Sequence, residues 1–328
     1  MRVRFLLLAF FLGVAFASSA HAQVAHSLIF IIHEDSSMVY FDHSGTPQNA
    51  GENSYEQALQ VATGCENCEV LLLRQSRPGL LPGLEARLEF FRNRKKIESF
   101  RYSRNVQGFD LQYESAFYLK NSQLRSDGHR YLIYFGYFIP EKEGAYSASF
   151  PWAKMSVERL VKNIRQFDPQ SAGKIFDLAV LSTCQNATPW GVFQFQKVAR
   201  YLVASSVPIP LQMMDVSRLQ ELGRVQSGEA LQILSSNIAR DSVQRMTGGS
   251  YSEVGVSVFD LEEVEIPTAI LSRYQSLLKG EVSPTFSYLD CETLGVHLPA
   301  PSESIFIPHR ILRGRPKTHS GWACPKQI

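Results

Sequence analysis

The sequence has almost no net charge, and this scarcity narrows the classes of partner that the chain can have. Lys and Arg number 33 against 31 Asp and Glu. Two of the arginines, Arg2 and Arg4, lie in an N-terminal segment that we expect to be removed, which leaves the remainder balanced. The basic surface of a nucleic-acid-binding protein is therefore not indicated. The one local basic run, residues 92–96, is interpreted as a solvated hairpin tip.

Long apolar runs are missing after the first residues, so no later segment is predicted to span a membrane. The start of the chain has the parts of a secretory signal peptide: a positive beginning, an uncharged apolar stretch over 5–17, and the small-x-small site Ala20-His21-Ala22. We expect residues 1–22 to be cleaved and the mature chain to begin at Gln23. The prediction is an exported protein, periplasmic or extracellular, with no membrane anchor after cleavage.

Cysteine is scarce too, and all five residues follow the predicted cleavage site: Cys65, Cys68, Cys184, Cys291 and Cys324. In an oxidising compartment an odd number leaves one thiol unpaired or shared with another chain. We expect Cys65 to bridge to Cys68, and Cys291 to Cys324 in a stretch rich in Pro and Gly. Cys184 then remains free. Four cysteines permit three connectivities, so the pairing is an inference.

The Cys65-x-x-Cys68 spacing also fits half of a zinc site or a redox pair. No second cysteine pair or compact histidine pair completes a zinc site, and no tryptophan-flanked redox motif surrounds it. We prefer a structural disulfide, and we predict neither a metal nor a cofactor.

Strand-like apolar runs alternate with helical ones, and no internal repeat or low-complexity tract divides the chain. The predicted strands cover 27–32, 69–74, 131–135, 176–181, 202–204 and 254–259, with a hairpin at 84–91 and 97–102. The predicted helices cover 55–62, 109–120, 157–167, 192–201, 230–246 and 266–278. This alternation favours one α/β domain over 23–282 with crossover connections. Residues 283–328 are expected to form an irregular C-terminal extension.

The segment from Asp177 to Pro189 is the richest in candidate chemistry. An apolar strand ends in Ser182, Thr183 and Cys184, and a helix begins shortly afterwards. Ligand crevices of parallel sheets lie at the carboxyl ends of the strands, so Cys184 is predicted at the functional edge. A nucleophilic cysteine needs a base and backbone donors for an oxyanion. A buried cysteine that acts as a small hydrophobe is the alternative, and the polar neighbours argue against it.

Residues 177–184 (DLAVLSTC), followed by 199–205 (ARYLVAS), resemble the clostripain-type branch of the caspase-like cysteine peptidases. The resemblance covers roughly 131–210, with a weaker echo at 27–35. It implies a caspase-like three-layer sandwich of α/β class, with a central, mostly parallel sheet and a disulfide-stapled C-terminal extension. It also implies that Cys184 stands at the position of the nucleophile.

The family's catalytic histidine ends the strand before the cysteine strand, and here that position is occupied by Tyr137, or by Gly136 if the register slips by one. Tyr137 and Cys184 are 47 positions apart, close to the separation of about 50 in caspases. Tyrosine has a pKa of about 10 and is a poor proton acceptor near neutrality. His33, at the end of the first strand, is the possible substitute base. His129 is expected at the opposite end of its strand.

Two functions remain open on these residues. The first is a degenerate peptidase homologue that binds a peptide or protein in the ancestral cleft. The alternative is an active cysteine endopeptidase with Cys184 as nucleophile and a non-standard histidine as base. A disulfide-stapled structural protein without a cleft would leave the polar segment 182–186 unexplained. The sequence fixes neither a cleavage-site preference nor the oligomeric state.

Overall fold

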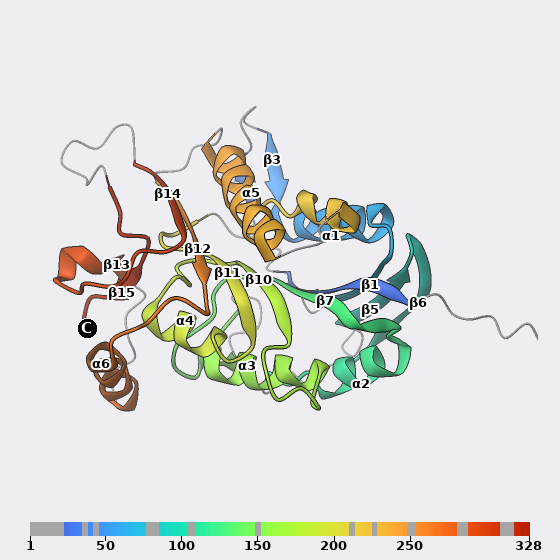
Figure 1. Cartoon of the computed structure of the whole chain (residues 1–328), viewed down its shortest axis with the longest axis horizontal. Coiled ribbons are helices and arrows are strands. Elements are labelled where there is room, and N and C mark those ends of the chain that lie inside the picture. The colour runs from blue at the N-terminus through green and yellow to red at the C-terminus, as the bar shows by residue number, and fades with distance from the viewer. Residues whose placement is uncertain are drawn as a thin grey trace, which may run out of the picture.

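A nine-stranded sheet runs through the centre of the computed structural model (Figure 1). The structure describes residues 23–34, 39–41, 46–76, 85–103, 109–147, 152–209, 214–224, 228–247, 253–280, 288–308 and 318–328. The predicted signal peptide lies outside these residues, as do His43 and His309.

Five adjacent strands of the sheet are parallel, and antiparallel strands extend it at both edges. The order across the sheet is β14-β12-β11-β10-β7-β1-β4-β5-β6. The parallel strands are β11 (Ala199–Ser205), β10 (Phe176–Ser182), β7 (Leu124–Phe135), β1 (Val24–His33) and β4 (Cys68–Gln75). The antiparallel edge strands are β5 (Ala86–Arg92) and β6 (Lys95–Tyr102) on one side, and β12 (Val254–Asp260) and β14 (Glu303–Ile307) on the other.

Helices cover both faces of the sheet, which makes three layers (Figure 1). One face carries α1 (Ala50–Gly64) and α5 (Gly228–Thr247), and the other carries α2 (Gln112–Asn121), α3 (Val157–Ile164) and α4 (Pro189–Phe195). The remaining helix, α6 (Thr268–Lys279), packs on α4. Short 3-10 turns are η1 (Arg165–Phe167), η2 (Ser217–Arg224) and η3 (Cys291–Leu294).

The central strands are buried on both faces, which explains their near-continuous apolar sequences. In β1 all ten residues are buried. Leu28, Phe30 and Ile32 pack in the core that includes α1 and α5, while Ile29 and Ile31 pack in the core that includes α3 and α4. The strand period of two residues therefore assigns odd and even positions of β1 to opposite layers.

The predicted α/β class with a mostly parallel central sheet is confirmed, and the predicted boundary between the helix after Cys184 and the strand that follows it is wrong. The helix expected over 192–201 ends at Phe195, and Ala199 to Tyr201 belong to β11. Ala199 and Tyr201 pair with Phe176 and Leu178 of β10. Pairing with the neighbouring strand outweighs the local helical spacing there.

Four cysteines form the predicted bridges, Cys65–Cys68 and Cys291–Cys324, and Cys184 is free. The second bridge joins η3 to β15 (Ala323–Pro325), which pairs with β13 (Tyr288–Asp290). Residues 288–308 and 318–328 are called the C-terminal extension below. Its segment β14, in a region predicted to be irregular, adds an edge strand to the main sheet.

Two further two-stranded ribbons lie outside the main sheet. They are β2 (Val39–Phe41) with β3 (Pro47–Asn49), and β8 (Gly144–Ala145) with β9 (Lys154–Met155). No helix among the described residues is long and apolar enough to cross a membrane.

Candidate functional site

The carboxyl ends of β7 and β10 lie side by side and bring Tyr137 next to Cys184. Ser182 pairs in register with Phe135. Beyond that pair, the Gly136 amide donates to the Ser182 carbonyl and the Cys184 amide donates to the Tyr137 carbonyl, both at 3.3 Å. Two positions 47 residues apart in the sequence thus share a backbone hydrogen bond at this edge of the sheet.

The chain turns sharply directly after the cysteine. Gln185 has φ of 50°, in the left-handed region that side chains other than glycine seldom adopt. The turn ends at Thr188, whose hydroxyl caps α4 by accepting from the Gly191 amide at 3.0 Å. Such strained backbone clusters at functional sites because the surrounding fold must hold it in place.

The Cys184 thiol is held in a neutral, hydrogen-bonded state. Its Sγ donates to the Ile209 carbonyl across 3.0 Å. Burial raises the pKa of Cys184 to about 11, because a thiolate loses its hydration in an apolar environment. A reactive cysteine has its pKa lowered by neighbouring positive charge, which is the opposite situation.

Residues following β11 cover the carboxyl end of β10 on the side of α1 and α5. Besides the Ile209 contact, the Met214 amide donates to the buried Ser182 hydroxyl at 3.0 Å. Ile209 and Met214 are both buried in the core that includes α1 and α5. The thiol therefore faces that layer of the molecule.

His33, the proposed substitute base, faces the opposite layer. Its ring is 3% exposed and is enclosed by Tyr134, Phe109 and Tyr146, with ring centroids 4.7–5.8 Å away. His33 Nδ1 and the Tyr134 hydroxyl share a hydrogen bond of 3.0 Å. The structure thus brings Tyr137 to Cys184, and it places His33 on the other side of the sheet.

The remaining described histidines give no base for the thiol either. His129, expected before its strand, lies within β7, level with the amino ends of β1 and β10, where it pairs with Asp177 at 3.3 Å and stacks on His26. His297 is exposed, and His319 Nδ1 accepts from the Gly321 amide within the C-terminal extension. Among the described residues, no imidazole hydrogen-bonds to the Cys184 sulfur.

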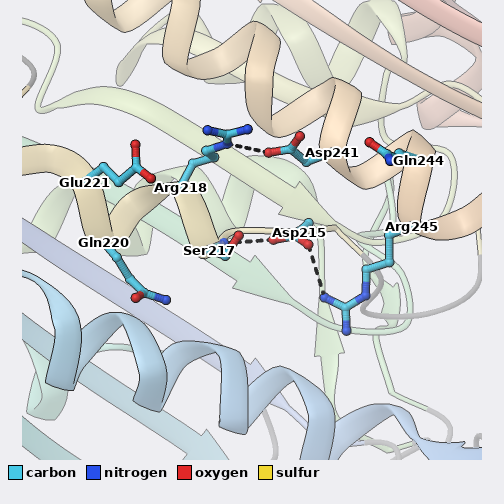
Figure 2. Close-up of a pocket in the computed structure, with 8 residues that line it drawn as sticks. All are labelled: Asp215, Ser217, Arg218, Gln220, Glu221, Asp241, Gln244 and Arg245. Atoms are coloured by element: carbon cyan, nitrogen blue, oxygen red, sulfur yellow. Dashed lines mark hydrogen bonds and ion pairs between the residues drawn. The ribbon is translucent and has the colours of Figure 1, made fainter.

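A polar pocket of about 550 Å³ opens at Asp215, the residue after Met214 (Figure 2). It lies between η2 and α5, above α1, and it contains two ion pairs: Arg218–Asp241 at 2.6 Å and Asp215–Arg245 at 3.7 Å. The Asp215 amide also donates to Ser242 of α5. These contacts fasten the chain just after Met214 to α5.

Sequence reasoning missed one group at this edge, the carboxyl of Glu141. It follows β7 by six residues and is buried, with its pKa raised to about 7 by that burial. A single glutamate after the end of a strand carries no sequence signal for burial. No cluster of three or more metal-ligating side chains occurs in the described part of the chain.

Comparisons with known proteins return solved structures only. No family model matches the chain, and no curated protein matches it. It is similar to a secreted C11 cysteine protease from Bacteroides thetaiotaomicron in complex with an irreversible peptide inhibitor, at 12% identity and a TM-score of 0.49, covering 73% of this chain and 66% of that one.

Two more solved structures are similar to this chain. "Iotapain", a secreted C11 cysteine protease of the same organism, has 9% identity and a TM-score of 0.47, over 76% of this chain and 74% of that one. An inactive zymogen C11 protease from Parabacteroides distasonis has 11% identity and a TM-score of 0.47, over 74% and 63%. The chain spans about two thirds of the length of the first of these relatives.

Proposed function

We propose that this chain is an exported homologue of the clostripain-type cysteine peptidases that binds a peptide or protein at the carboxyl edge of the sheet without cleaving it. The observation that carries the proposal is the state of Cys184. The thiol stands at the end of β10, hydrogen-bonded to a carbonyl and with a pKa of about 11. Its neighbour across the edge is Tyr137, where the resembled family has its histidine.

Chemistry favours binding over turnover at such a site. Acyl transfer to a cysteine requires removal of the thiol proton before or during attack. At neutral pH a thiol with a pKa of about 11 has on the order of 10⁻⁴ of its molecules as thiolate. Ile209 supplies an acceptor for the proton, but a backbone carbonyl does not act as a base at neutral pH.

The test measures binding and turnover on the same protein. Fluorescein-labelled peptides from a casein digest are titrated with the mature chain by fluorescence anisotropy, and intact labelled casein reports cleavage. We expect binding without cleavage, and binding should persist in Cys184→Ala, since the thiol is not needed to hold the peptide. Cleavage by the wild type that disappears in Cys184→Ala would contradict the proposal.

The alternative, an active endopeptidase with an unusual histidine base, gives a different pattern. In that case His33→Gln should abolish cleavage together with Cys184→Ala. A gain-of-function variant adds a second test: Tyr137→His puts an imidazole on the residue whose carbonyl accepts from the Cys184 amide, and it should speed alkylation of the thiol at neutral pH. Tyr113→His is the matched control, because Tyr113 is 55% exposed on α2 and does not contact the site.

A further inference from the structure

The C-terminal extension lies directly against both loops of the candidate cleft. Phe138, Tyr288 and Ala323 form a small buried cluster, and Tyr137 packs against it. The Ala323 amide donates to the Ala187 carbonyl at 2.9 Å, three residues after Cys184. One strand of the extension thus contacts the loop after β7, and another is hydrogen-bonded to the loop after β10.

The buried side chain of Glu141 lies between the loop after β7, the loop after β10 and the C-terminal extension. Its Oε2 accepts from the Tyr288 hydroxyl of the extension at 3.4 Å, and Thr188 of the cysteine loop also donates to it. Tyr274 of α6 also lies close to Glu141, and a negative charge on Glu141 raises the pKa of the Tyr274 hydroxyl. Glu141 Oε1 and the Tyr274 hydroxyl have no hydrogen-bond partner among the described residues.

Among the described residues, no positive charge compensates an ionised Glu141. The groups that face it are the hydroxyls of Thr188, Tyr274 and Tyr288, and burial raises the pKa of both tyrosines far above their ordinary value, so they stay neutral. The neighbouring charges point elsewhere: Lys142 donates to the Gly280 carbonyl, and Glu143 pairs with Arg159. An unpaired buried carboxylate is strongly disfavoured, so the neutral acid is the form that fits.

We infer that Glu141 is a positioning residue that, while protonated, fastens the C-terminal extension over the Tyr137 and Cys184 loops, so that a rise in pH toward neutrality loosens the extension and opens the cleft. This inference deepens the proposed function, because the cleft is the one proposed above. It concerns opening alone and holds whether the opened site binds or cleaves.

The direction and size of the effect follow from linkage. In the closed form the pKa of Glu141 is about 7, and in the open form this pKa returns toward its ordinary value of 4.5. Between pH 4.5 and pH 7 Glu141 is ionised in the open form and protonated in the closed form. The equilibrium constant for opening therefore rises tenfold per pH unit in this range. The total gain is about 300-fold, and the equilibrium is constant above pH 7.

Hydrogen exchange of the Ala323 amide measures this opening, since that amide is hydrogen-bonded to Ala187 in the closed form. Intrinsic exchange is base-catalysed and rises tenfold per pH unit. For the full-length mature protein we expect a hundredfold rise per unit between pH 5 and 7, and a tenfold rise above pH 7. Glu141→Gln keeps a neutral hydrogen-bonding side chain and should give the tenfold rise throughout.

Two variants make the result decisive. Glu143→Gln, an exposed change on the same loop, should behave as the wild type. Tyr288→Phe removes a donor to the carboxylate, so the break near pH 7 should move to higher pH. Equal profiles for the wild type and Glu141→Gln would overturn the inference. Failure of the proposed function would instead appear as casein cleavage, which leaves the Ala323 profile unchanged.

Discussion

The folded protein should protect Cys184 from alkylation by about 100-fold near pH 7.5, relative to the same chain unfolded. Burial raises the pKa of Cys184 from its ordinary value of 9.0 to about 11 in the folded structure. The difference of about 2 pH units equals about 100-fold less thiolate, which is the form that iodoacetamide attacks. Partial burial of the sulfur only adds to the protection.

The assay uses iodoacetamide over pH 7 to 9.5, with the modified residue located by mass spectrometry. Cys184 is the only free cysteine, since the other four are in disulfides. Unfolding in guanidinium without reductant therefore gives an internal reference rate for this one thiol. The folded rate should rise tenfold per pH unit without a plateau, because the whole range lies below the pKa.

A plateau in the alkylation rate between pH 7 and 8 would refute the reasoning. It would mean that the thiolate already forms near neutrality, which requires a base or positive charge beside Cys184 that the contact with Ile209 does not provide. Fast reaction with a steady tenfold slope would instead mean that the sulfur is more accessible than its burial indicates.

Two stability measurements test other parts of the site. Folded Glu141 keeps its proton up to about pH 7, while the unfolded chain loses it near pH 4.5. The free energy of unfolding of the wild type should therefore fall by about 3 kcal/mol as the pH rises across that window. Denaturant titrations at pH 4.5 and 8 should show this fall for the wild type and not for Glu141→Gln. Gly136→Ala places a Cβ 2.7 Å from the Tyr134 ring and should cost about 1–3 kcal/mol, whereas Gly173→Ala, with no atom within 4 Å, should change stability by less than about 0.5 kcal/mol. Equal values for the two glycine variants would show that the Tyr134 ring moves aside freely.

The amino-acid sequence by itself determined the layer architecture and the chemistry of the cysteines. Strands such as β1 and β10 are short, continuous apolar runs, and helices such as α3 present one apolar face, so the α/β alternation can be seen without coordinates. The odd cysteine count predicted a free thiol, and the inferred pairing of Cys65 with Cys68 and of Cys291 with Cys324 is confirmed. The apolar runs and the spacing of Cys65 and Cys68 are local features of the sequence, and the cysteine count is a property of the whole chain.

Only the tertiary structure decided which side chains meet at the carboxyl edge of the sheet. His33 is the last residue of β1 and Cys184 follows β10, but side-chain direction alternates residue by residue, and packing places the two on opposite layers of the sheet. The hydrogen bond between Cys184 and Ile209 joins residues 25 positions apart, and the one between Tyr288 and Glu141 joins residues 147 positions apart. Such contacts are set by how distant segments pack, and the same packing, through desolvation, sets the pKa values on which the chemistry of the site depends.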